Sequence, residues 1–161
     1  MIQFEKVLRH LTDNGVEFVV IGGLAVISHG HARATVDLDV CYARSPENVK
    51  RLVDALAPLS PKLRGAPPEL PFFWDVQTLR NGLNFTLTTT AGDIDVLGEV
   101  TGLGGYGEMA LRAVVVELYG LTIKILSLED LIRSKAAAGR AKDLVDLEAL
   151  RALQARSSTK T

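Results

Sequence analysis

The stretch IGGLAVISHGHARATVDLDV, from Ile21 to Val40, decides how this chain folds. The glycine pair Gly22-Gly23 ends one apolar run, and Asp37 and Asp39 stand two residues apart in a second apolar run. Alternate residues of a strand face the same way, so both carboxylates are expected on one face of a strand. The residues expected to pack on its other face are Val36, Leu38 and Val40.

Two carboxylates side by side on a rigid strand repel each other unless a cation lies between them. Mg²⁺ is the hard, oxygen-seeking cation that joins such carboxylates to nucleotide phosphates. A solvated strand face would also explain two aspartates, but aspartate is depleted in strands unless something compensates for it. The pattern therefore indicates a metal-dependent nucleotidyltransferase.

A second carboxylate pair occurs in the run DIDVL at 93–97. If this run forms a strand beside the first one, one of its carboxylates completes a metal site of three acids. Asp95 is the better candidate, because apolar residues bracket it within the strand. Asp93 follows Gly92, so a role in the turn is expected for it.

Basic residues in the segment SKAAAGRAKDLVDLEAL, at 134–150, are candidates for binding a triphosphate. Lys135 and Lys142 are seven residues apart and would share one face of a single helix, although Gly139 argues against one straight helix. Lysine binds phosphate as a point charge, whereas arginine can form two parallel bonds to it. The alternative is a solvated helix whose acidic and basic side chains pair locally.

The glycine pair and one arginine extend this candidate phosphate site. A junction between a strand and a helix can bring backbone N–H groups against phosphate oxygens, and Gly22 and Gly23 are expected at such a junction. Arg33 lies four residues before the first aspartate and can reach the same phosphates. His29 and His31 are more typical of packing at a helix end than of a metal site.

Composition fits one soluble domain with a packed core. The chain has 161 residues, is 47% apolar and 23% charged, and has a formal net charge of -1, so no global basic field points to nucleic acid. Cys41 is the only cysteine, which excludes an internal disulfide and favours a small buried side chain. No signal peptide is evident, and no apolar run approaches the ~20 residues of a membrane helix, so a cytoplasmic protein is expected.

The order of predicted elements gives the fold class. Helical spacing and caps predict helices at 3–13, 24–29, 45–56, 128–138 and 142–153. Compact or alternating apolar runs predict strands at 17–21, 36–42, 84–90, 93–97, 113–118 and 121–125, with the last two pairs as hairpins. Prolines predict a loop at 58–72, glycines predict a flexible connection at 98–107, and 76–79 fits either a strand or a turn. We expect one α+β domain over residues 1–155, with a mixed sheet, flanking helices, a C-terminal helical segment and a frayed tail at 156–161.

The joint order of four motifs carries a family resemblance. These motifs are GG at 22–23, HGHARATVDLDV at 29–40, DIDVL at 93–97 and SKAAAGRAKDLVDLEAL at 134–150. Together they resemble the nucleotidyltransferase superfamily with the polymerase-beta-like fold, over about residues 16 to 150. Within it, the chain is most similar to small bacterial proteins of the AbiEii/MenT-like branch.

The resemblance implies a reaction and its participants. Asp37 and Asp39 would hold two Mg²⁺ ions, for which Mn²⁺ can substitute, and Asp95 would share the catalytic ion. The substrate would be an NTP whose phosphates contact Gly22, Gly23, Arg33, Lys135 and Lys142. One metal would lower the pKa of an acceptor hydroxyl, the other would stabilise the pyrophosphate leaving group, and the hydroxyl would attack the α-phosphate in line.

The acceptor and the biological role follow less directly from the resemblance. An RNA 3′ end, a protein side chain and a small hydroxylated molecule are all candidate acceptors. The likeness also implies a component of a toxin–antitoxin pair, with a cognate antitoxin or a second copy of the chain as partner. Many relatives carry Gly-Ser at the glycine pair and a longer C-terminal lobe. The alternative function is therefore a non-catalytic module that binds nucleotide or a partner on the same fold.

Overall fold

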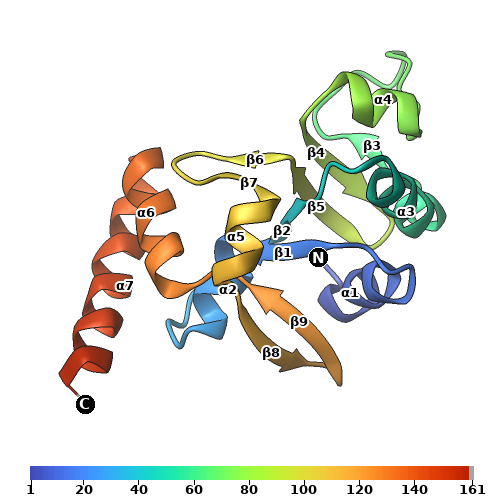
Figure 1. The fold of residues 1–161 in the computed structure, drawn as a ribbon. Helices are drawn as coiled ribbons and strands as arrows, with labels where there is room; N and C mark the ends of the chain where they lie inside the picture. The colour runs from blue at the N-terminus through green and yellow to red at the C-terminus, as the bar shows by residue number, and fades with distance from the viewer. Residues whose placement is uncertain (160–161) are drawn as a thin grey trace.

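The computed structural model describes residues 1–159 and has the predicted mixed α+β class (Figure 1). Its helices are α1 (Phe4–Asp13), α2 (Gly22–Ser28), α3 (Pro46–Leu56), η1 (Ala57–Leu59), α4 (Val76–Asn81), α5 (Tyr106–Arg112), α6 (Leu128–Ala138) and α7 (Ala141–Thr159). Its strands are β1 (Phe18–Ile21), β2 (Asp37–Tyr42), β3 (Lys62–Leu63), β4 (Asn84–Thr89), β5 (Gly92–Leu97), β6 (Glu99–Val100), β7 (Gly104–Gly105), β8 (Val114–Leu118) and β9 (Leu121–Ile125). Among residues 1–159, no helix combines the length and apolarity needed to cross a membrane.

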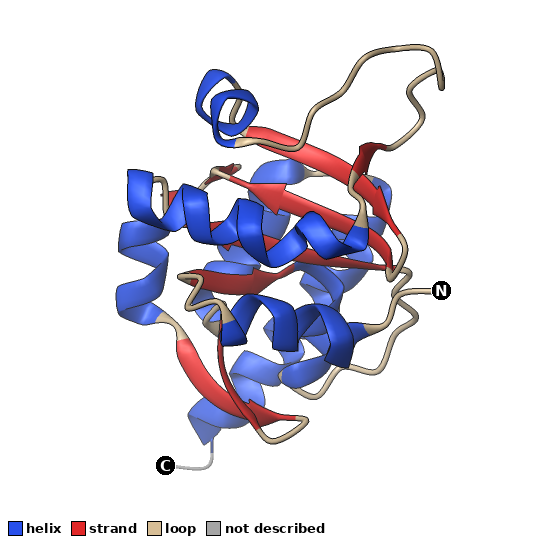
Figure 2. Cartoon of the chain, turned by 90° about the vertical axis from the view of Figure 1, so that its right-hand side faces the viewer, coloured by secondary structure: helices blue, strands red, loops and turns tan. Residues whose placement is uncertain are grey.

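Seven strands form one mixed sheet in the order β3-β4-β5-β2-β1-β9-β8. The pairs β2–β5 and β1–β9 are parallel, and the other neighbouring pairs are antiparallel. The sheet lies between α1 and α3 on one side and α6 and α7 on the other (Figures 1 and 2). Strand β2 is therefore central both in the strand order and between the two helical layers.

The central strand has the predicted alternation. Leu38 and Val40 are fully buried, whereas Asp37 and Asp39 on the other face are only partly buried. Val36 is an exception, because the strand begins after it and its surface is 76% exposed. The expectation that Val36 packs in the core is wrong.

Local capping sets two of the predicted helix starts and one helix end. The Ser45 hydroxyl accepts a hydrogen bond from the Asn48 N–H at the start of α3, and Ser127 accepts one from the Asp130 N–H at the start of α6. Gly139 ends α6 with a φ of 64°, a left-handed conformation that glycine adopts without strain.

Several segments expected to be irregular are ordered into regular elements. The proline-rich stretch contributes η1 and the edge strand β3, and the glycine-rich connection forms the β6–β7 hairpin. Strand β3 is stabilised by backbone pairing with the distant strand β4, which no local pattern reveals, whereas β6 and β7 pair with each other across a short turn. Residues 76–81 form helix α4, not a strand or a single turn, and helix α5 was not expected. Helix α7 continues to Thr159, and residues 160–161 of the expected tail lie outside the described part of the chain.

Candidate active site

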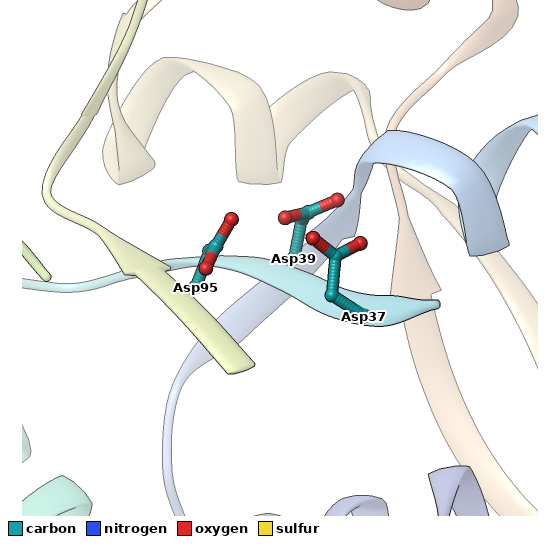
Figure 3. Close-up of side chains that lie close together, drawn as sticks. All are labelled: Asp37, Asp39 and Asp95. Atoms are coloured by element: carbon teal, nitrogen blue, oxygen red, sulfur yellow. The ribbon is translucent and has the colours of Figure 1, made fainter. Parts of the chain in front are cut away.

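Three aspartates meet on one face of the sheet. Asp39 of β2 is in direct register with Asp95 of the parallel strand β5, and Asp37 lies two residues before Asp39. Figure 3 shows the three side chains rising from the same face and gathering above it. A carboxylate oxygen from each lies within 4.8 Å of an oxygen from each of the others, the arrangement needed to share a cation.

Asp93 occupies the same sheet face but has a different neighbour. It is in register with Asp37, and its Oδ2 lies 3.3 Å from Nε of Arg64. The expected role of Asp93 in the β4–β5 turn is wrong, because the hydroxyl of Thr89 bonds to Gly92 O and Ala91 N there. Of the two carboxylates on β5, the structure brings Asp95 into the aspartate cluster.

The glycine pair lies in the first turn of α2, not in a loop before the helix. Gly22 has a φ of +67°, and a Cβ there would lie 2.9 Å from Cβ of Asp39 and closer still to its carboxylate. At Gly23 a Cβ would lie 2.6 Å from the hydroxyl oxygen of Thr35. A serine at position 23 would therefore collide with Thr35, and both glycines are needed for β2 to pack this close to α2.

The alternation between cavity-lining and exposed residues begins before Asp37. Arg33, Thr35, Asp37 and Asp39 all line one cavity, whereas the intervening Ala34 and Val36 are exposed. The alternation Arg-x-Thr-x-Asp-x-Asp is visible in the sequence and would have identified Thr35, which was not among the predicted site residues.

Acidic and basic side chains both line this cavity. Its volume is about 260 Å³, and Asp37, Asp39 and Asp95 all face it. The cationic side chains that line the same cavity are Arg33, Lys135, Arg140 and Lys142. The structure thus brings together all eight residues predicted for the site, including Gly22 and Gly23. Arg140, another basic residue of the segment 134–150, lines the cavity as well.

Asp146 of α7 holds two of these cations. Arg33 donates a short hydrogen bond to its carboxylate, and Nζ of Lys135 lies 3.1 Å from the same Oδ2 atom. Asp146 is almost completely buried. The alternative of purely local pairing does not hold for this residue, which joins α7 to α6 and to the segment before β2.

Asp143 holds the third cation. Arg140 donates from Nε to its Oδ2 over 2.6 Å, and Lys135 lies 3.4 Å from its Oδ1. Burial alone would raise the pKa of Asp143, but the Arg140 hydrogen bond and the charge of Lys135 outweigh it and lower that pKa. Asp143 therefore stays ionised and keeps the two basic side chains beside the cavity.

Lys135 and Lys142 do not share one helix. Gly139 separates α6 from α7, so the geometry of a single helix face does not apply. Lys135 is nearly buried, whereas Lys142 is exposed. The turn between the helices nevertheless brings both to the same cavity.

Burial and mutual repulsion both disfavour the ionised forms of the clustered carboxylates. Burial, followed by the Asp37 charge and a hydrogen bond with Asp95, raises the pKa of Asp39 to about 8. Burial and the charge of Asp95 also raise the pKa of Asp37, against the opposing charges of Arg64 and Lys142. A divalent cation among these oxygens would favour the ionised carboxylates and lower their pKa values. The three oxygen donors and their mutual repulsion therefore both fit Mg²⁺.

His29 and Cys41 have structural roles. Nε2 of His29 lies 2.8 Å from the Leu126 carbonyl oxygen, and His29 ends α2. Cys41 is a fully buried free thiol, as its sequence context predicted. Within residues 1–159, Asp37, Asp39 and Asp95 are the only cluster of three or more acidic, histidine or cysteine side chains that could hold a metal ion.

Comparison with known proteins identifies the family. Residues 1–157 match the family model described as nucleotidyltransferase of unknown function (DUF6036). The chain belongs to this nucleotidyltransferase family. The match covers nearly the whole chain, and it does not confirm the AbiEii/MenT-like branch.

Solved structures share the fold of this nucleotidyltransferase. The Thermotoga maritima protein TM1012 is 19% identical, with a TM-score of 0.53, and the alignment covers 97% of this chain and 96% of that one. The lincosamide antibiotic adenylyltransferase LnuA, solved with lincomycin bound, is 13% identical, with a TM-score of 0.57 and coverage of 94% and 98%. ANT(2")-Ia in complex with adenylyl-2"-tobramycin is 14% identical, with a TM-score of 0.56 and coverage of 98% and 95%. None of the curated proteins compared with the chain matches it.

Proposed function

We propose that this nucleotidyltransferase moves a nucleoside monophosphate from an NTP onto a hydroxyl group, with Mg²⁺ held by Asp37, Asp39 and Asp95. One observation carries the proposal. Three carboxylates within 4.8 Å of one another share a cavity with four basic side chains. The charges of this lining complement a divalent cation and a polyanion together, which is the ionic composition of a metal–NTP complex.

Each residue of the site has a role in this reaction. Two Mg²⁺ ions, or Mn²⁺ in their place, would supply the Lewis acidity that activates the acceptor hydroxyl and stabilises pyrophosphate. Asp37 and Asp39 provide ligands from the rigid central strand, and Asp95 provides the third carboxylate from β5. The backbone at Gly22 and Gly23 is open to the cavity and is proposed to contact phosphate oxygens.

The basic side chains are proposed to bind the phosphates. Arg33, Lys135 and Lys142 were predicted for this role, and Arg140 joins them in the cavity. Asp143 and Asp146 already hold three of these four basic side chains in ion pairs before substrate binds. Few side chains therefore have to be ordered when the phosphates bind. The acceptor oxygen then attacks the α-phosphate in line with the departing pyrophosphate.

A small hydroxylated molecule is the acceptor class that we propose first. The protein LnuA was solved with lincomycin bound. The alignment with this chain covers 98% of LnuA, so LnuA holds its ligand without a large additional lobe. ANT(2")-Ia was solved with an adenylylated tobramycin. A formal net charge of -1 favours a small acceptor over an RNA 3′ end, and a protein hydroxyl is the third class to test.

The same chemistry is compatible with a toxin whose action a cognate antitoxin or a second copy of the chain controls. We propose that it acts in the cytoplasm, where NTPs and Mg²⁺ are present. Growth arrest on expression that Asp37→Ala relieves would support the toxin role. Harmless expression of an active enzyme would contradict it.

Transfer of labelled nucleotide tests the proposed function directly. The protein is incubated with Mg²⁺, each α-labelled NTP and a panel of aminoglycosides, lincosamides, RNA and proteins, and labelled acceptor and pyrophosphate are measured. We expect transfer in the wild type and a loss of at least ~100-fold in Asp39→Asn, because the shared metal ligand is lost.

The matched control is Asp54→Asn, which changes an exposed aspartate paired with Lys50 and should keep full activity. A wild-type protein that binds no NTP at millimolar concentration in the presence of Mg²⁺ would contradict the proposal. Nucleotide binding without turnover on any acceptor would favour the non-catalytic module instead.

A further inference from the structure

Arg64 approaches the aspartate cluster from outside the cavity. It directly follows β3, and its backbone N–H donates to the Thr86 carbonyl over 3.0 Å, so that the β3–β4 pairing continues through it. Its guanidinium lies over the neighbouring strands of the same sheet. The prolines around this residue predicted an irregular loop at 58–72, and no role was expected for it.

The guanidinium makes two hydrogen bonds and one further ion-pair contact. One terminal nitrogen donates to the Leu87 carbonyl and to Oδ1 of Asp95, each over 2.8 Å. Nε lies 3.3 Å from Oδ2 of Asp93. Because Leu87 is part of a strand, Arg64 is anchored to the sheet and is not a mobile surface cation.

The strand order determines which side of Asp95 this contact uses. Strand β5 lies between β4 and β2, so Leu87 is on one flank of Asp95 and Asp39 is on the other. Arg64 therefore holds Asp95 from the flank opposite Asp37 and Asp39. One oxygen of Asp95 is occupied there, and the carboxylate still contributes an oxygen to the aspartate cluster.

Charge supports the same conclusion. Asp37, Asp39, Asp93 and Asp95 lie on one face of two adjacent strands, and Arg64 is the basic residue in ion-pair contact with both carboxylates of β5. Without this cation, repulsion from the other three carboxylates would favour rotation of Asp95 away from them.

We propose that Arg64 is a positioning residue for nucleotidyl transfer, which orients the Asp95 carboxylate toward the cation shared with Asp37 and Asp39. This inference rests on the proposed function, because it assigns a partner to one of the metal ligands proposed there. Groups that orient metal ligands in this way typically contribute 10–100-fold to metal affinity or activity.

Binding of Mn²⁺ alone, followed by the loss of the free-ion signal in electron paramagnetic resonance, tests the inference without any acceptor. We expect Arg64→Gln to weaken Mn²⁺ binding by about 10-fold. In an Asp95→Asn background the same substitution should change Mn²⁺ affinity by less than about twofold, because Arg64 acts through Asp95. Once an acceptor is known, kcat should fall by about 10-fold or more while KM for the NTP stays within about threefold.

Arg112→Gln is the matched control. Arg112 also donates from a partly exposed guanidinium to an aspartate, Asp130, but this ion pair joins α5 to α6 away from the cluster. Its loss should leave Mn²⁺ affinity and kcat within about twofold of the wild type. Thermal unfolding of every variant shows that it is folded at the assay temperature.

The outcomes separate this inference from the proposed function. If the wild type binds Mn²⁺ and transfers nucleotide but Arg64→Gln matches it, the role of Arg64 is wrong and the proposed function stands. Tighter Mn²⁺ binding by Arg64→Gln would also overturn the inference, because Arg64 would then compete with the metal. If the wild type neither binds Mn²⁺ nor transfers nucleotide, the proposed function fails and the inference fails with it.

Discussion

Gly22 is the residue on which the geometry of the carboxylate cluster depends most tightly. It follows Ile21, the last residue of β1, which is in register with Asp39. Gly22 turns the chain into α2 with a positive φ and leaves the space that the Asp39 side chain fills. The close approach of helix and strand thus requires both the conformational freedom and the missing side chain of this glycine.

Gly22→Ala should therefore lower stability by more than the backbone strain alone and should also weaken cation binding. The positive φ costs roughly 1–2 kcal/mol in any L-residue, and displacement of Asp39 adds to it and weakens cation binding. Chemical denaturation and Mn²⁺ titration measure the two effects. Gly120→Ala is the control, since its φ is +75° and nothing lies within 4 Å of the added Cβ. Equal losses in the two variants would contradict this account.

Asp39 should give the metal-free protein a measurable pH dependence. Its pKa is about 8 in the folded chain against an ordinary 3.8, so between about pH 4 and pH 8 the folded state holds a proton that the unfolded state releases. This contribution to stability is largest below pH 4 and is lost as the pH rises through 8.

In the presence of EDTA, we therefore expect the Tm of the wild type to fall between pH 5.5 and pH 8.5 more steeply than that of Asp39→Asn. Saturating Mg²⁺ should raise the wild-type Tm more at pH 8.5 than at pH 6, because the ion must displace the proton. Parallel curves for the two proteins would show that Asp39 does not carry this proton.

Helix α7 is the element that organises the basic side of the cavity. The break at Gly139 lets α7 pack against α6, and two successive acidic positions on its buried face, Asp143 and Asp146, contact the cations. Asp146 also reaches Arg33, which lies 113 residues earlier in the sequence. The phosphate-binding side chains are thus held by packing of a helix and not by their own loops.

Loss of this contact should affect both stability and substrate binding. Asp146→Asn leaves Lys135 nearly buried with weaker compensation from Asp143, which should cost about 3 kcal/mol of unfolding free energy. KM for the NTP should rise more than kcat falls. The exposed neighbour variant Glu148→Gln should leave both unchanged, and a similar change in that variant would contradict the role of Asp146.

Across the whole molecule, the sequence predicted the parts whose signal is local. Period-two alternation identified the strands that carry Asp37, Asp39 and Asp95, and serine caps identified the starts of α3 and α6. The same local signals, strand alternation and helix caps, predicted the mixed α+β class.

The parts that depend on tertiary contact were missed. Strand β3 and Arg64 are ordered by pairing with β4, more than twenty residues later, and proline-rich composition gave the opposite expectation. Pairing of Asp146 with Arg33 is likewise invisible in either segment alone. Thr35 is different, because its alternation with Arg33 and Asp37 was present in the sequence and could have been used.

A crystal structure with Mn²⁺ and a non-hydrolysable NTP analogue, measured at the manganese absorption edge, tests the central claim most directly. We predict anomalous density for Mn²⁺ between the carboxylates of Asp37, Asp39 and Asp95, with the triphosphate extending toward Lys135 and Lys142. Manganese bound elsewhere, or a triphosphate outside this cavity at saturating concentrations, would contradict the account.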